Sequence, residues 1–435
     1  MANKDVIHFA GDINIEKINI QSFDGTTYSI SNQLVAIQIF EDLFSPFMSG
    51  ILTIKDSLDF MNGLPMVGQE LLDISIFTPT LKDKGGHIKG QFYINEIKNR
   101  EYAQERSVIY ELSFVSKEAV LDSNVKLSKG FSGLISDVVK NVLTDKLVRF
   151  DTAKNINIES TINSTQYVSN FWSPTRNMQY LCEQALNKNE SASYIFFENK
   201  DGFNFGSIET LSTSPTITQE FRYNNSTQAV SPTGTSQRDI QSDYQRITMF
   251  SLKKGFNVLK RSSEGMLTSV AFSADITTKR YHSSIFNYGD WFSGVNQLND
   301  FPLYLKEDKE FPIFYTARVL EEARSHDNFT DKGDTSNFKM SQRRISEVVQ
   351  ATDYVVEINV PGRTDYTVGQ VVRLTMFQTE PMTKTEGDRE QLDKIFSGRY
   401  LVSSINHYIT REKHECSMEL VKDSYISNFS KTSAK

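Results

Sequence analysis

The sequence is poor in cysteine and proline, and each shortage excludes a class of protein. Among 435 residues the only cysteines are Cys182 and Cys416, too few for a disulfide framework or a repeated zinc motif. Ten prolines against 30 phenylalanines and 18 tyrosines favour strands over disordered coil. No apolar run approaches the about 18 residues of a membrane-spanning helix, and the N-terminus lacks the apolar core of a signal peptide. We therefore expect a soluble protein made in a reducing compartment.

Basic residues are also in deficit. The formal net charge is −7, which argues against a nucleic-acid binder because phosphate recognition needs a basic surface. With roughly one domain per 150 residues, the length predicts about three domains, enough to bury a large core without metals or disulfides.

Catalytic motifs are missing as well. The sequence has no GxSxG, Walker A, GxGxxG or HExxH motif. Of the six histidines only His407 and His414 lie close together, with Cys416 beside them. A tetrahedral metal site needs four ligands, or three and a water. We expect His414 and Cys416, on one face of an alternating strand, to be a packed surface pair rather than metal ligands.

The acidic residues do not form an evident site. The stretch 327–334 lacks the spacing of an EF-hand loop and reads as a polar loop. Glu321 and Glu322 are neighbours on an expected helix and do not face each other. Glu16, Asp56 and Asp59 are the remaining candidates for a glycosidase-like cleft, and nothing in the sequence places them together. We expect no catalytic residue, no cofactor and no metal.

Both ends of the chain read as antiparallel strands with one buried face, because apolar and polar residues alternate. The predicted strands near the N-terminus are 34–40, 50–55, 71–77, 93–97 and 108–115. Those near the C-terminus are 354–360, 370–377, 400–408 and 416–422, interrupted by a charged loop at 379–394.

Residues 120–210 read as a small α+β unit. The apolar spacing predicts a helix over 133–147 with Ser132 as a candidate cap, and a second helix capped by Ser173 with Pro174 at its first position. A strand pair at 193–197 and 203–208 follows, with a turn at Asp201 and Gly202.

The remaining middle region is more mixed. Residues 211–237 are rich in Ser, Thr and Asn and are either a linker or a long exposed loop. We expect strands at 244–252 and 267–272, a short helix at 316–325 and a polar loop at 327–342.

The two strand-rich ends contain an internal repeat. Gly90 and Gly398 are each followed by an aromatic residue after two positions and by β-branched residues after four and seven. Glu-Leu pairs at 111–112 and 419–420 lie 21 and 22 residues after their glycines without a gap. This pattern indicates a duplicated β-barrel domain; generic similarity between two hairpins is the alternative.

The segments that contain the repeat also resemble a known family. Residues 49–79 read SGILTIKDSLDFMNGLPMVGQELLDISIFTP, and residues 396–408 read FSGRYLVSSINHY before MELVKDS at 418–424. Together with 257–288, these segments resemble, in order, the central baseplate hub protein of contractile-tailed bacteriophages. That family is similar in fold to the base of type VI secretion spike proteins.

The resemblance implies a mainly β fold with an α+β insert. It comprises two similar antiparallel β-barrel domains of the tail-tube type and two smaller α+β domains. The expected domains are 1–120, the first barrel; 121–238, an α+β domain and polar linker; 239–262 with 350–424, a discontinuous second barrel; 263–349, an inserted domain; and 425–435, a tail.

The implied function is structural. Three chains with two barrels each would form a trimeric ring with pseudo-sixfold symmetry, joining the hexameric tail tube, or a tube initiator, to a trimeric central spike. The lumen would face tape measure protein or passing DNA, and acidic walls would let DNA slide. The protein would reside in the virion tail after assembly in the host cytoplasm, without membrane insertion. The turn chemistry of Asn62, Gly63, Leu64 and Pro65 makes this loop a candidate subunit or partner contact.

Two alternatives remain open. One is the base of a type VI secretion-like spike; those chains usually continue into a spike, so an ending at Lys435 favours a separate spike protein. The other is a tail-associated hydrolase, which a cleft with paired carboxylates would favour.

Overall fold

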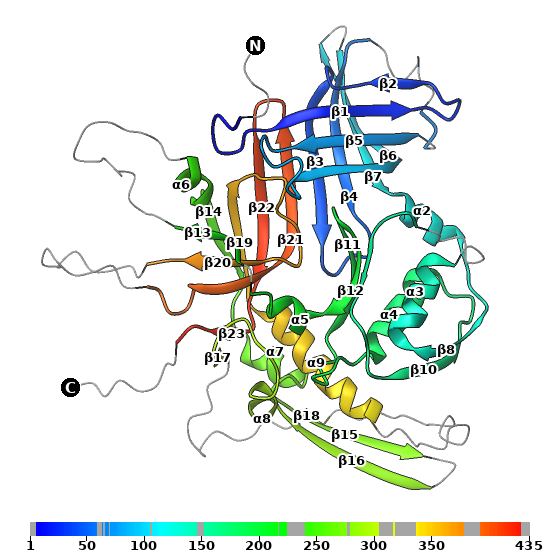
Figure 1. Cartoon of the computed structure of the whole chain (residues 1–435), viewed down its shortest axis with the longest axis vertical. Coiled ribbons are helices and arrows are strands. Elements are labelled where there is room, and N and C mark those ends of the chain that lie inside the picture. The colour runs from blue at the N-terminus through cyan, green and yellow to red at the C-terminus, as the bar shows by residue number, and fades with distance from the viewer. Residues whose placement is uncertain are drawn as a thin grey trace, which may run out of the picture.

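The computed structural model shows a mainly β chain in which a large sheet is packed against a smaller α+β unit and a β-hairpin with a long helix (Figure 1). It describes residues 6–58, 63, 66–68, 70–104, 107–145, 152–215, 217–223, 240–275, 279–303, 316–317, 336–377 and 392–427. No helix in these ranges has the length and apolar character needed to cross a membrane.

The N-terminal half of the large sheet is entirely antiparallel. Its strands are β1 (Asn14–Gln21), β2 (Thr27–Ser29), β3 (Leu34–Asp42), β4 (Ser49–Asp56), β5 (Leu71–Phe77), β6 (His87–Gln104) and β7 (Ser107–Ser116). Their spatial order is β3-β4-β7-β6-β5-β1-β2. In β5, Leu72, Ile74 and Ile76 are buried while Asp73 and Ser75 are partly exposed, so the predicted alternation is confirmed.

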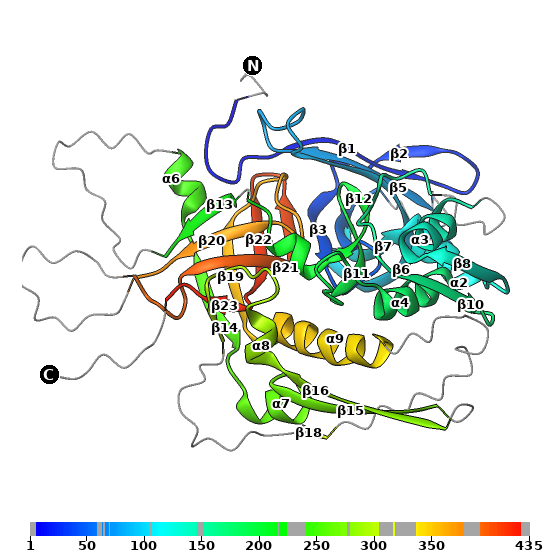
Figure 2. The same ribbon diagram turned by 60° about the horizontal axis from the view of Figure 1, so that its bottom comes forward.

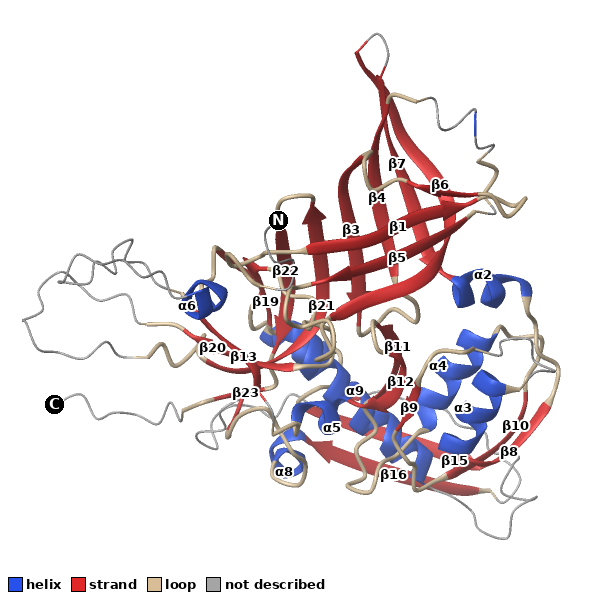
Figure 3. Cartoon of the chain, turned by 45° about the horizontal axis from the view of Figure 1, so that its top comes forward, coloured by secondary structure: helices blue, strands red, loops and turns tan. Residues whose placement is uncertain are grey.

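The C-terminal half has the order β14-β19-β22-β21-β20-β13. Its strands are β13 (Ile217–Arg222), β14 (Met249–Lys254), β19 (Val355–Pro361), β20 (Val371–Thr375), β21 (Gly398–Thr410) and β22 (His414–Val421). One edge of β21 has two partners: its first residues pair with β20, and its last residues pair with β3. This β21–β3 junction merges the two halves into one sheet (Figure 3).

The two halves repeat one five-stranded arrangement. The orders β3-β4-β7-β6-β5 and β14-β19-β22-β21-β20 are equivalent, and every pairing within them is antiparallel. Gly90 lies opposite Ile74, and Gly398 lies opposite Leu374 in the same place. β6 and β21 also share a bulge at the fifth residue after the glycine. The predicted repeat is therefore confirmed in strand order and pairing.

One detail of the predicted repeat is wrong. Ile97 pairs with Leu112, whereas the equivalent Ile405 pairs with Met418 rather than with Leu420. The two Glu-Leu pairs are therefore not structurally equivalent. The β6–β7 hairpin has extra bulges between Lys98 and Gln104, which shift its return strand by two residues.

The α+β unit follows β7. Its elements are α2 (Lys117–Asn124), β8 (Gly130–Leu134), α3 (Ile135–Thr144), β9 (Ile156–Ile158), β10 (Ser164–Val168), α4 (Pro174–Gln184), β11 (Tyr194–Asn199), β12 (Gly202–Ser207) and α5 (Ile208–Ser212). α4 begins as predicted, because the Ser173 side chain accepts a hydrogen bond from the Arg176 amide and Pro174 follows it. The predicted cap of α3 is wrong: Ser132 pairs within β8, and Leu134 occupies the cap position.

The remaining elements flank β14, fill the segment between β14 and β19, or follow β22 at the C-terminal end. Its elements are α6 (Ile240–Gln245), α7 (Val258–Ser263), β15 (Thr268–Asp275), β16 (Arg280–Asn287), α8 (Tyr288–Phe292), β17 (Phe301–Pro302), β18 (Thr316–Ala317), α9 (Ser336–Asp353) and β23 (Ser424–Tyr425). α9 lies between the β15–β16 hairpin and the rest of the molecule (Figure 2).

Several expectations for this region are corrected. The strand expected at 244–252 begins only at Met249, after a helix. The stretch 211–237 contains the end of α5 and all of β13, and 224–239 lies outside the described residues.

Residues 316–317 form a strand instead of starting a helix, and 318–335, with Glu321, Glu322 and 327–334, lie outside the described ranges. The loop expected at 327–342 is helical from Ser336 onward. The helical periodicity was missed because the buried face of α9 includes the polar residues Gln342, Ser346 and Gln350.

Separate cores support the two sheet halves and the α+β unit. Ile37, Leu52 and Leu112 are in the N-terminal core, and Val356 and Met418 are in the C-terminal one. Among the described residues, the strand order runs from β14 to β2 with no pairing that closes either half into a barrel.

Candidate assembly interfaces

The predicted contact loop is only partly described. Gly63 is exposed between β4 and β5, while Asn62, Leu64 and Pro65 lie outside the described residues. The role of this loop stays a prediction.

A single buried carboxylate ties three parts of the chain together. Glu41 of β3 accepts a hydrogen bond from the Lys200 amide at 3.0 Å through Oε1. Its Oε2 accepts from the Thr367 hydroxyl and from the Val368 amide, the latter at 3.1 Å. Burial raises the pKa of Glu41 to about 7, against the opposing effect of these hydrogen bonds. Glu41 therefore links both repeats to the β11–β12 turn.

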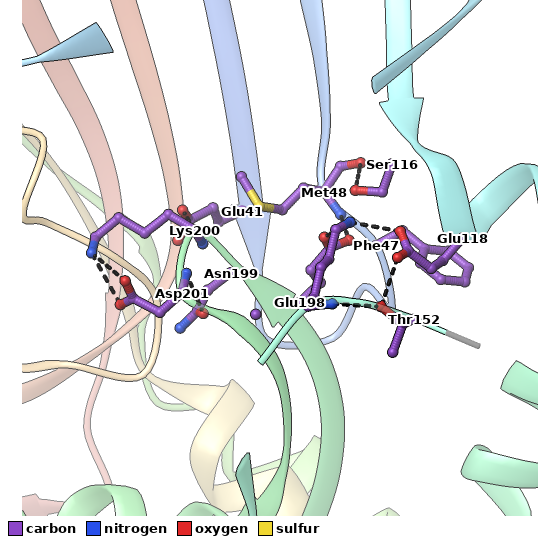
Figure 4. A network of polar contacts seen from close by, with 12 residues as sticks. Glu41, Phe47, Met48, Ser116, Glu118, Thr152, Glu198, Asn199, Lys200 and Asp201 are labelled. Carbon is purple, nitrogen blue, oxygen red and sulfur yellow. Dashed lines mark hydrogen bonds and ion pairs between the residues drawn. The ribbon is translucent and has the colours of Figure 1, made fainter. Parts of the chain in front are cut away.

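A cavity of about 640 Å³ lies between β6 and the α+β unit. Its wall includes Glu118 and Glu198, and Lys154 binds both carboxylates, at 2.6 Å in the case of Glu118. The other Glu118 oxygen accepts from the Thr152 hydroxyl at 2.8 Å, and the other Glu198 oxygen accepts from the Met48 amide at 3.0 Å. Figure 4 shows Glu118, Glu198 and Thr152 converging on this point.

This carboxylate pair is arranged as a structural clamp. Each of the four oxygens of Glu118 and Glu198 has a hydrogen-bond donor from the chain. Burial raises the pKa of Glu198, and the Lys154 ammonium opposes that shift. A general acid or base must reach a substrate proton, whereas all four of these oxygens are occupied, and the contact to Met48 holds the α+β unit against the start of β4.

Of the acids considered from the sequence, the described residues Glu16 and Asp56 do not line this cavity. Glu16 is on the surface, where it pairs with Lys82 at 2.7 Å. Asp56 is buried at the end of β4 and accepts from the Leu58 amide at 2.9 Å. Asp59 lies outside the described residues.

His407, His414 and Cys416 form a cluster, and the expectation of a surface pair is wrong because all three are buried. His407 Nδ1 and His414 Nε2 are 3.0 Å apart, and the Cys416 sulfur is 3.3 Å from each. Burial lowers the pKa of both imidazoles, that of His407 to about 3, and raises the pKa of the Cys416 thiol. Burial therefore favours the neutral form of all three side chains.

The long helix α9 fastens the inserted region to the α+β unit. Arg344 donates hydrogen bonds to the carbonyls of Cys182, Ala192 and Tyr194 at 2.8–2.9 Å. Glu347 accepts from the Ser191 hydroxyl at 2.8 Å and from the Trp291 indole at 3.1 Å. Burial raises the pKa of Glu347 to about 7.

These linking residues were missed in the sequence, although one carried a signal. Glu41 continues the alternation of Ile37 and Ile39 on the buried face of its strand, where a carboxylate is unexpected and needs partners. No comparable local signal marks Glu198 or Arg344, because their partners are distant in the sequence.

No family model matches the chain, and no curated protein matches it. Solved structures do match in fold. A tail protein from Neisseria meningitidis MC58 superposes with a TM-score of 0.54 over 95% of this chain and 97% of its own, at 8% identity. The 43 kDa tail protein of prophage MuSo2 from Shewanella oneidensis gives 0.55 over 94% and 99%, at 9% identity.

The match with a type VI secretion component from E. coli is weaker, with a TM-score of 0.42 over 96% of this chain and 79% of the other, at 8% identity. The two stronger matches are both tail proteins. The chain thus has the fold of phage tail proteins.

Proposed function

We propose that this chain is the structural hub of a contractile-tail baseplate. Three copies form a ring with pseudo-sixfold symmetry, which joins a hexameric tail tube to a trimeric central spike. The protein belongs to the virion tail and is assembled in the host cytoplasm.

The observation that carries this proposal is the repeat of five strands within one chain. Two equivalent units lie side by side and share the β21–β3 junction. A chain with two equivalent units presents six units when it trimerises, so one face matches a sixfold partner while the other keeps threefold symmetry. Closure of each half into a tube-like barrel belongs to the same proposal.

The type VI secretion-like spike base is the second candidate, since it uses the same architecture. The clamp at Glu118 and Glu198 disfavours the hydrolase alternative. Both carboxylates lie at the cavity wall, but hydrogen-bond donors of the chain already occupy all four of their oxygens.

The test is the mass of the purified chain by native mass spectrometry, alone and co-expressed with a candidate central spike protein. We expect a trimer that binds a spike trimer. A chain that stays monomeric under both conditions contradicts the hub proposal. Turnover of purified peptidoglycan would instead support the hydrolase.

A further inference from the structure

The large sheet has several strand edges without a partner among the described residues, including the outer edges of β2 and β13, and two of them correspond to the two sides of the β21–β3 junction. One is the outer edge of β14, which pairs only with β19. The other is the second half of β6: β5 covers this edge only as far as Tyr93, and residues 95–103 are exposed except for the half-buried Ile97. An exposed edge of this length presents unpaired main-chain N–H and C=O groups, which can pair with a strand of another chain.

The repeat shows what each edge is equivalent to. β14 corresponds to β3, and the second half of β6 corresponds to the second half of β21. Within the chain, those two counterparts are paired with each other at the β21–β3 junction. The two open edges are therefore the two sides of a second junction of the same kind.

The exposure of equivalent residues supports this reading. At the existing junction, Ile39 and Ile409 are 0% exposed. Their counterparts at the open edges are Leu252, which is 44% exposed, and Tyr102, which is 77% exposed. Apolar side chains thus occupy the positions that the existing junction buries.

We propose that β6 of one subunit pairs antiparallel with β14 of the next copy of this chain. The register follows from the existing junction, where Tyr408 lies opposite Gln38 and Ile409 lies opposite Ile37. The equivalent pairs between subunits are Glu101 with Ser251 and Tyr102 with Phe250. The proposal rests on the proposed function, and it names the surface that builds the ring.

Beside the paired positions, β14 has a bulge at Lys253, and the Lys253 ammonium pairs within its own chain with Glu357 at 2.6 Å. Because the two edges are different surfaces, the contact is head-to-tail and generates a ring when the rotation closes.

The experiment is a disulfide cross-link in the full chain. The double variant Glu101→Cys, Ser251→Cys places sulfurs on paired residues, whose Cα separation of about 4.5–5.5 Å suits a disulfide. Cys182 and Cys416 are buried and add little background. We expect covalent dimers and trimers on a non-reducing gel after mild oxidation.

Two controls fix the interpretation. A mixture of the single variants Glu101→Cys and Ser251→Cys must stop at dimers, because each chain then has one reactive edge. The pair Thr27→Cys, Ser251→Cys uses the exposed strand β2 instead and must not form a ladder.

The outcomes separate the two proposals. A trimer by mass that gives no cross-link, or that cross-links through Thr27, overturns the edge pairing and leaves the hub proposal standing. A chain that is monomeric with and without the spike overturns both.

Discussion

Thr78 and Thr364 exchange hydrogen bonds across the two repeats, although 286 residues separate them. The Thr78 amide donates to the Thr364 hydroxyl at 2.8 Å, and the Thr364 amide donates to the Thr78 hydroxyl at 3.0 Å. The Thr364 hydroxyl in turn donates to the Gly86 carbonyl at 2.7 Å. Each hydroxyl therefore satisfies a buried amide of the other repeat.

We expect Thr364→Val to lower the free energy of unfolding by about 1–3 kcal/mol, since it leaves the Thr78 amide buried without an acceptor. Urea denaturation followed by circular dichroism measures the change. Thr364→Ser keeps the hydroxyl and should recover most of the loss. Equal losses in both variants would show that the methyl group, not the hydrogen bond, matters.

Lys154→Met should destabilise the chain strongly, by about 3–5 kcal/mol, because it leaves two buried carboxylates without their counter-ion. Adding Glu198→Gln removes one of those charges and should restore part of the stability. Thermal unfolding of the single and double variants measures both effects. No recovery in the double variant would contradict the clamp.

Glu41 makes stability depend on pH in a defined direction. Its folded pKa of about 7 lies above the ordinary value of 4.5, so the folded state binds the proton more tightly. The resulting stabilisation is present below pH 4.5 and is lost as pH rises through about 7. In Glu41→Gln we expect this fall between pH 4.5 and 7 to become smaller in urea-denaturation profiles, with the remainder due to Glu347, whose pKa is also raised to about 7.

The buried histidines make stability depend on pH in the opposite direction to Glu41. The folded pKa of His407 is about 3, below its ordinary 6.5, so its contribution is present above pH 6.5 and is lost as pH falls toward 3. A Glu41→Gln profile that falls as steeply as that of the unmodified chain between pH 4.5 and 7 would show that Glu41 does not contribute to the fall.

The two cysteines should be inert in the folded protein. Burial raises the pKa of Cys182 to about 12 and raises that of Cys416 as well, and thiolates are the reactive form. We expect no reaction with Ellman's reagent in native buffer and two thiols after denaturation. Rapid labelling of one thiol in the native state would indicate that its surroundings open.

Leu252→Asp should weaken self-association without unfolding the monomer, since Leu252 lies at an exposed edge. Sedimentation velocity should show a shift from trimer to monomer. Val168→Asp changes an apolar residue on β10 that is even more exposed, at 70% against 44% for Leu252, and lies outside the proposed contact, so it should leave the trimer intact. An unchanged trimer in Leu252→Asp would count against burial of Leu252 in the contact between subunits.

The strands were predictable from the sequence because their alternation follows directly from one buried face. The cap of α4 was predictable as well, because Ser173 and Pro174 act locally. The helix α9 was not, since polar residues such as Gln342 form part of its buried face and find distant partners such as the Ser269 carbonyl. The Lys154 clamp was not predictable for the same reason, because only the fold brings Lys154 together with Glu118 of α2 and Glu198 of β11.

The β21–β3 junction also has a mechanical consequence. The two repeats are joined by a continuous ladder of main-chain hydrogen bonds, with Ser404 to Thr410 of one facing Ala36 to Asp42 of the other. Rotation of one repeat against the other would have to break this ladder, so the two repeats should move as one rigid body. Any change in the diameter of an assembly of such chains must then occur at the contacts between chains.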